Sequence, residues 1–254
     1  MQPWFDKRQT LKLTAPNTFV VIQVIASLFL LFISWKRPYA TEYAWAAATL
    51  LGLTGYALPL LITHIPIATF FWEWWQHVCI GYTTFFILVF ANRYFDRKVH
   101  SIEVTALLWV TLSAVFSLGF GIGEWEEVYY RYGGRFWGYT CVCMSLYPLQ
   151  RVVKETFTRR DFQSCLVLGA ALVLFILGSH DTLFVLGIKS SETGYLFHFA
   201  SPLVALLLTS ILILRFIDAS TALEELNDTV SVLKSALWTD DLVRATLCTA
   251  YPES

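Results

Sequence analysis

Residues 163–187 read QSCLVLGAALVLFILGSHDTLFVLG, and this stretch holds a single formally charged residue, Asp181. A helix rises about 1.5 Å per residue, and about 20 predominantly apolar residues cross the hydrocarbon core of a bilayer. The whole chain has a matching composition, because only 15% of its 254 residues are charged, whereas a soluble domain carries about 25% charged residues. The sequence therefore predicts an all-α integral membrane protein.

Similar apolar stretches recur along the chain, and only short loops separate them. We expect about seven membrane helices, at residues 17–35, 43–65, 70–94, 101–120, 134–152, 163–187 and 194–216. The predicted fold is a polytopic helix bundle over residues 1–216, followed by a cytoplasmic coiled-coil helix over residues 217–237. Residues 238–254 form a short tail that we leave unassigned.

Lysine and arginine near the predicted helix ends indicate the orientation. With the C-terminus in the cytoplasm, the inner loops and helix ends hold most of the basic residues, namely Lys36, Arg37, Arg93, Arg97, Lys98, Arg151, Lys154, Arg159, Arg160 and Arg215. The outer loops hold Arg131, Arg135 and Lys189. Three further basic residues precede the first span and favour an inner N-terminus, so the side of the N-terminus and the retention of the first span stay open.

Composition also excludes several classes of protein. The net charge is −1 and basic residues form no extended patch, so we expect no nucleic-acid partner. The five cysteines stand mostly inside apolar runs and show no paired zinc-site spacing, so we expect neither a disulfide framework nor a metal. Lys189 precedes the last span instead of lying in it, which argues against a retinal Schiff base. We predict no cofactor.

Ionisable residues within the spans give the best internal clue to function, because they are costly in hydrocarbon and usually face the bundle interior. Glu73 and His77 lie in the third predicted span, His180 and Asp181 in the sixth, and His198 at the start of the seventh. In the orientation given above, all of them gather at the outer end. Glu73 and His77 are four residues apart and share one helix face, whereas His180 and Asp181 are neighbours on different faces. These five are the candidate ligand-sensing residues.

Other interpretations of these residues stay open. They can hold the bundle together through hydrogen bonds between helices. The outer histidines and Asp181 can serve a metal-dependent membrane hydrolase. A small transporter is a third alternative, but it needs polar residues that continue to the inner face, and the inner halves of the spans are mainly apolar. The glutamates over residues 124–127 are expected in a solvated loop. We assign no catalytic residue.

A heptad pattern begins as the last span ends. Apolar residues alternate at gaps of three and four, which is typical of a helix that pairs with another helix; they are Phe216, Ala219, Leu223, Leu226, Val230, Leu233 and Leu237. The alternative is an amphipathic helix on the membrane surface. Glu224, Glu225 and Asp228 disfavour it, because anionic lipid repels an acidic face. We therefore expect a homodimer.

Part of the chain also resembles a known family. The steps Gly178-Ser179-His180-Asp181-Thr182-Leu183, Tyr195-Leu196, Pro202, Leu214-Arg215-Phe216 and Glu225-Leu226-Asn227 are similar to the end of the seven-transmembrane sensor region, 7TMR-DISM type, of bacterial receptor histidine kinases. The similarity covers about residues 178–230. It implies a dimeric receptor in the bacterial inner membrane, with a membrane sensor domain that responds to a small ligand, a proton or an ion.

The resemblance also implies a route for the signal. Residues Arg215, Phe216, Leu223, Leu226, Val230 and Leu233 would pass a conformational change to a cytoplasmic kinase or cyclase. After His198 the sequence holds no histidine, and it shows neither a glycine-rich ATP-binding region nor a cyclase signature. The transmitter activity would therefore reside in a further C-terminal part or in a partner protein.

Overall fold

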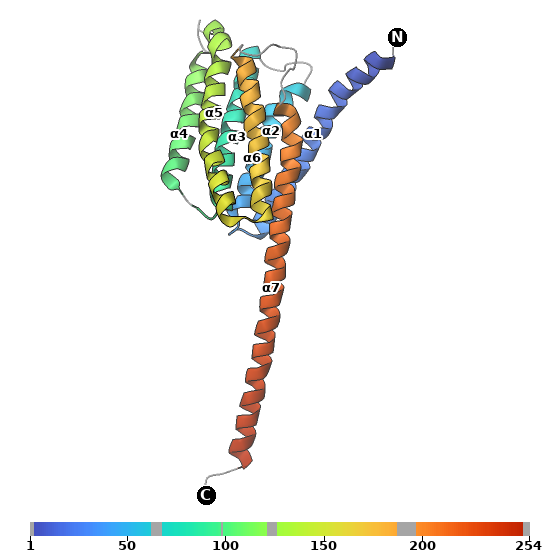
Figure 1. Cartoon of the computed structure of the whole chain (residues 1–254), viewed down its shortest axis with the longest axis vertical. Helices are drawn as coiled ribbons and strands as arrows, with labels where there is room; N and C mark the ends of the chain where they lie inside the picture. The colour runs from blue at the N-terminus through green and yellow to red at the C-terminus, as the bar shows by residue number, and fades with distance from the viewer. Residues whose placement is uncertain (1–2, 62–67, 98, 121–125, 187–196, 251–254) are drawn as a thin grey trace. The chain divides into compact units, whose positions relative to one another are not determined.

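The computed structural model describes residues 3–61, 68–97, 99–120, 126–186 and 197–250. Within these ranges it describes the side chains except those of residues 3–17, 19, 59–61, 126, 184, 197–201 and 236–250. The described residues form helices and no strand. The helices are α1 (Pro3–Lys36), α2 (Thr41–Leu61), α3 (Thr69–Tyr94), α4 (His100–Phe120), α5 (Glu126–Arg159), α6 (Phe162–Val185) and α7 (Phe197–Ala250) (Figure 1).

Four of these helices are long and apolar enough to cross a membrane, by length and composition. They are α3, α4, α6 and the part of α7 over Pro202–Ser235. The described part of α1 contains a shorter apolar helix, Val20–Lys36. The all-helical prediction is therefore confirmed, and several of the helices match the requirements of a membrane span.

The chain divides into two units, Met1–Ile211 and Leu212–Ser254. In the first unit, Figure 1 shows α1 to α6 side by side, and two side-chain contacts show that α2 and α3 run antiparallel. Trp45 of α2 packs against Phe85 near the end of α3, with ring centroids 6.1 Å apart. At the other end of the same helices, the Trp75 indole N–H donates to the carbonyl oxygen of Gly55 at 3.2 Å.

The exposed face of α4 is apolar, whereas its buried face carries mostly polar or small side chains. Its buried face consists of Glu103, Ala106, Val110, Ser113, Ala114 and Ser117. Its exposed face carries large apolar side chains, of which Leu112, Val115 and Phe116 are 64–66% exposed. In α1, likewise, Gln23 and Ser27 are fully buried. Small and polar residues favour close packing between helices in lipid, so this distribution suits a hydrocarbon environment.

Three tryptophans, Trp72, Trp74 and Trp75, lie in the first two turns of α3. The indole N–H groups of two of them bind backbone oxygens of neighbouring helices. Trp74 donates to Ala114 of α4 at 3.0 Å, as Trp75 does to Gly55 of α2. These two tryptophans therefore hold α3 against α2 and α4 through their indole N–H groups.

A bidentate ion pair joins the end of α3 to the start of α4. Arg93 Nη1 lies 2.9 Å from Glu103 Oε1, and Arg93 Nη2 lies 2.7 Å from Glu103 Oε2. The Asn92 side-chain amide, which is fully buried, donates to the same carboxylate at 3.1 Å. The ionisable residues of the predicted spans were expected at the opposite end of the bundle, and buried Glu103 shows that this expectation was incomplete.

Further contacts gather the basic residues at this same end. Arg159, the last residue of α5, donates to the backbone oxygen of Phe95 at 3.2 Å and lies 3.7 Å from Asp96. Arg97 lies 3.7 Å from Glu155. The segment between α3 and α4 is thus joined to the end of α5. We call this the basic end of the bundle.

Helix α5 is longer than the sequence predicted. It has 34 residues, begins at Glu126 and contains Pro148. The expected solvated loop is therefore wrong for Glu126 and Glu127, which belong to the first turn; Glu124 lies outside the described residues. Glu127 lies 3.5 Å from Arg131, and both side chains are well exposed. Apolarity locates the part of a helix that suits lipid, but a helix can continue into water, where its charged residues are solvated.

Helix α7 is continuous over 54 residues and includes the predicted junction at residue 216. In the second unit, the described side chains from residue 221 to residue 235 are all exposed. Leu223, Leu226, Val230 and Leu233 are 53–63% exposed. The apolar heptad seam is thus uncovered in the single chain.

Asp161 caps the N-terminus of α6, and its removal should be measurable. Its Oδ2 accepts from the Ser164 backbone N–H at 3.2 Å, so Asp161→Ala should cost about 1 kcal/mol. Burial alone would raise the pKa of Asp161, but hydrogen bonds from Ser164 and the nearby Arg159 charge lower it overall. The contribution should therefore be present above about pH 5 and fall as the carboxylate is protonated at lower pH.

Denaturation of the wild type and of Asp161→Ala in bicelles, at pH values above and below about 5, measures the difference in their free energies of unfolding. Asp161→Asn, which keeps a capping oxygen, is the control and should retain most of the stability at neutral pH. An Asp161→Ala deficit that does not change with pH would contradict the proposed contribution of the carboxylate charge.

Candidate functional site

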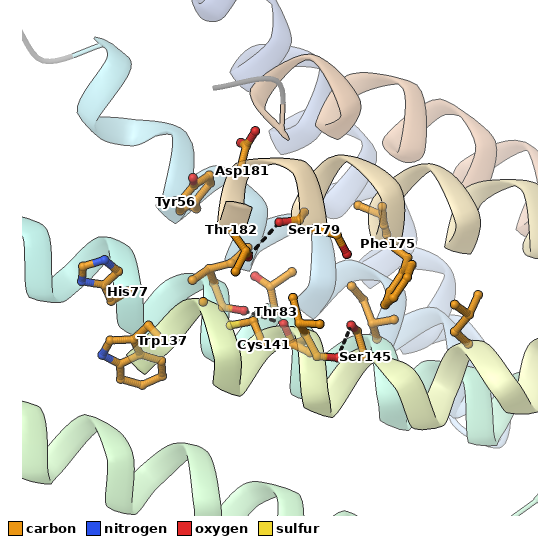
Figure 2. A pocket seen from close by; sticks show the side chains of 18 of the residues that line it. Tyr56, His77, Thr83, Trp137, Cys141, Ser145, Phe175, Ser179, Asp181 and Thr182 are labelled. Carbon is orange, nitrogen blue, oxygen red and sulfur yellow. Dashed lines mark hydrogen bonds between the residues drawn. The ribbon is translucent and has the colours of Figure 1, made fainter. Parts of the chain in front are cut away.

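A cavity of about 350 Å³ lies between four helices of the first unit (Figure 2). This volume is within the range of small-ligand sites, about 300–1,000 Å³. Tyr56 of α2 contributes to the wall, together with α3 over residues 76–87, α5 over residues 134–152 and α6 over residues 171–185. The described helices thus enclose a site large enough for a small organic molecule.

Each helix contributes one face, as the spacing of its lining residues shows. On α3 the cavity is lined by His77, Ile80, Thr84 and Ile87, at gaps of three or four. The lining positions of α5 and α6 follow the same helical period. Figure 2 shows His77, Tyr56 and Asp181 toward one end, and Phe175 and Ser145 toward the other. We call the first the polar end of the cavity.

His77 is held in place from two sides. Its Nδ1 lies 2.7 Å from the hydroxyl of Tyr129, a residue that is only 3% exposed. Its ring stacks on that of Trp137 with an interplanar angle of 4° and a centroid distance of 6.4 Å. Because Tyr129 engages Nδ1, Nε2 is the ring nitrogen left for a guest molecule.

Asp181 lines the cavity, whereas its neighbour His180 does not belong to the lining. The His180 Nδ1 lies 3.1 Å from Asp181 Oδ1. A hydrogen bond of this kind needs the proton on Nδ1, because the carboxylate only accepts. The Nε2 of His180 and the hydroxyl of Ser179 are both buried without a hydrogen-bond partner among the described residues. The lining therefore combines a carboxylate held by His180 with the unpaired hydroxyl of Ser179.

Glycines allow α5 to approach its neighbours near this end. A Cβ on Gly138 would lie 2.9 Å from Thr182 Cγ2 of α6, and a Cβ on Gly81 would lie 2.5 Å from the Trp137 ring. Both distances are too short for a real Cβ. Glycine at these positions lets helix backbones approach closely, as in other membrane bundles.

The structure brings together only some of the predicted sensing residues. His77 and Asp181 line the cavity, and Glu73 does not, although it lies on the same helix face as His77. Glu73 is close enough to Tyr129 to interact with it electrostatically. His180 lies outside the lining and contacts Asp181, which belongs to it. The side chain of His198 lies outside the described side chains.

Comparison with known protein families, curated proteins and solved structures gives no match to this chain. The resemblance to the sensor region of receptor kinases therefore rests only on the sequence steps quoted above for residues 178–230. Among the described residues, no group of three or more histidine, cysteine, aspartate or glutamate side chains is arranged to hold a metal ion.

Several residues of the site were not predicted, among them three that surround His77. Gln76 and Trp137 line the cavity, and Tyr129 holds His77 from outside it. The missed signal was a polar side chain directly before His77, together with aromatic residues close to Gly133, Gly134 and Gly138. Buried aromatic rings beside glycines indicate close helix packing more than an interfacial belt.

Proposed function

We propose that the chain is the membrane input module of a bacterial receptor: a small ligand in the cavity shifts the bundle between two conformations, and α7 passes the change to a cytoplasmic transmitter. The observation that carries this proposal is a cavity whose polar end holds His77 and Asp181. A pocket with a few convergent polar groups is the usual form of a ligand site.

The position of the cavity supports a receptor. Its wall combines α2, α3, α5 and α6, so a guest contacts four helices at once. A ligand shifts a conformational equilibrium only by its difference in affinity between the two states. A guest that contacts several helices can favour one arrangement of those helices over another.

The proposed topology has seven spans, an inner-membrane location and a cytoplasmic C-terminus. The basic end contains Arg93, Arg97 and Arg159, and positively charged loops favour the cytoplasmic side. The polar end of the cavity would then face outward, where an external stimulus can reach it.

The proposed output is a parallel homodimer through the seam of α7. The seam residues Leu223, Leu226, Val230 and Leu233 are exposed in the single chain and follow a heptad pattern. Pairing with a second copy would cover them. A cytoplasmic kinase or cyclase, carried by another protein or by a longer form of this one, would respond to the pairing.

Cysteine cross-linking in native membranes tests this output. Leu226→Cys should cross-link efficiently between copies under mild oxidation, because facing seam positions are in contact in a parallel coiled coil. Asp228→Cys is the matched control, since it lies on the opposite face of the same helix turn. It should cross-link much less.

A cross-link yield at Asp228→Cys equal to that at Leu226→Cys would contradict pairing through the seam. The absence of a cross-link at Leu223→Cys, Leu226→Cys and Leu233→Cys in folded protein would contradict the dimer itself. Both results are read from non-reducing gels, with folding checked by size-exclusion chromatography.

A further inference from the structure

We propose that the ligand of the cavity is a single-chain amphiphile whose head group donates hydrogen bonds, either a hydroxyl or an ammonium. This inference rests on the proposed function and specifies the class of ligand. It follows from the length of the cavity, from its apolar walls and from the charge at its polar end.

The cavity is long and follows the helices. Its lining on α6 extends from Ala171 to Val185, which is about 21 Å at 1.5 Å per residue, and its lining on α5 extends from Gly134 to Val152. A volume of about 350 Å³ over such a length gives a narrow space. A straight alkyl chain fits this shape better than a compact ring system or a two-chain phospholipid.

The half of the cavity away from His77 is apolar. It is lined by Ile87, Leu149, Val152, Leu174 and Phe175, with Pro148 and Ala171. Val152 and Pro148 are buried, and the other residues of this wall are half-buried. Such a lining offers dispersion contacts to an alkyl chain and no hydrogen bond to a polar ligand.

The hydroxyl groups in the middle of the cavity do not alter this conclusion, because backbone oxygens of their own helices accept their protons. Thr83 donates to the Cys79 carbonyl at 2.8 Å, and Thr84 donates to the Ile80 carbonyl at 3.0 Å. Ser145 similarly donates to Val142 at 2.9 Å. The middle of the cavity therefore needs no polar partner from a ligand.

The polar end carries a carboxylate, and its lining also includes the Trp137 indole N–H, a buried donor without a partner among the described residues. Asp181 is the acidic residue among the lining residues, and the lining holds no lysine or arginine. The hydroxyl of Ser179, also in the lining, has no partner among the described residues. A carboxylate or phosphate head would be repelled by Asp181, whereas a hydroxyl or ammonium head can donate to it.

The test is equilibrium binding of radiolabelled dodecanol and dodecylamine to the purified chain in nanodiscs, with empty nanodiscs subtracted. Both should bind saturably at one molecule per chain, and dodecanoate should bind at least about tenfold more weakly, because it loses a charged hydrogen bond and gains repulsion. Affinity referred to the free aqueous ligand should rise about fourfold per methylene until the chain fills the cavity.

Two matched variants locate the site. Ala171→Phe places a ring in the apolar half and should lower the affinity for dodecanol at least about tenfold. Ile176→Phe lies on the same helix but is 60% exposed and outside the lining, so it should bind as the wild type does. Asp181→Asn should weaken dodecylamine more than dodecanol, since the amide keeps an acceptor oxygen but loses the charge.

Equal binding of dodecanoate would overturn the proposed head group. If Ala171→Phe leaves the affinity for dodecanol unchanged, the proposed site is wrong. If neither dodecanol nor dodecylamine binds, the ligand class is wrong. The proposed function would still be supported if Ala171→Phe alone alters the pairing of α7, because that result depends on filling the cavity and not on the ligand.

Discussion

Arg93→Met is expected to destabilise the bundle by about 3–5 kcal/mol, the largest stability effect of any single substitution considered. The reason is the carboxylate left behind. Glu103 has a side chain that is 9% exposed and receives both guanidinium nitrogens of Arg93. Without Arg93, the buried charge keeps only the neutral amide of Asn92 as a hydrogen-bond donor.

The matched control is the double variant Arg93→Met with Glu103→Leu, which removes both charges and should recover most of the lost stability. The measurement is the free energy of unfolding in bicelles, for Arg93→Met and for the double variant. A double variant as unstable as Arg93→Met would show that the loss comes from packing. A stable Arg93→Met protein would contradict the burial of the ion pair.

Trp137→Ala is the second change with a large expected effect, about 3 kcal/mol. Trp137 is 1% exposed, stacks on His77 and fills the space opposite Gly81. Removal of a buried aromatic ring costs about 3–5 kcal/mol in soluble proteins. We use the lower end of this range, because helices packed in lipid gain no free energy from moving apolar surface out of water. The substitution then removes mainly packing contacts.

Tyr139→Ala is the control for this prediction. Tyr139 lies on the same helix and is 57% exposed, so its removal should change stability by no more than about 0.5 kcal/mol. The size swap Gly81→Ala with Trp137→Leu provides a second check, since the smaller side chain should relieve the contact that Gly81→Ala alone creates. Equal unfolding free energies for Trp137→Ala and Tyr139→Ala would contradict the close packing of α3 and α5.

The helical class of the fold could be predicted because apolar length is a local property. The stretch around residues 163–187 needs no partner to be recognised as a helix suited to lipid, and α6 (Phe162–Val185) ends within two residues of it. Helix ends outside the apolar stretches were predicted less well. α5 continues to Arg159, because exposed charged residues cost a helix little once it reaches water.

The candidate site was predictable only in part, since a helix face can be deduced from spacing but its rotation in the bundle cannot. Glu73 and His77 share a face, yet only His77 lines the cavity. The burial of Trp137 depends on Gly81, which lies in another helix 56 positions earlier in the sequence. Arg93 and Glu103 were nearer in sequence, and their opposite charges on either side of a short loop were a usable signal.

One measurement tests most directly whether the cavity controls α7. Spin labels at Leu226→Cys report the distance between the two copies of the proposed dimer in membranes, and Ala171→Phe fills the cavity without any ligand. We expect a shifted distance distribution for Ala171→Phe and an unchanged one for the exposed control Ile176→Phe. Identical distributions in all three folded proteins would contradict a link between the occupied cavity and the signalling helix.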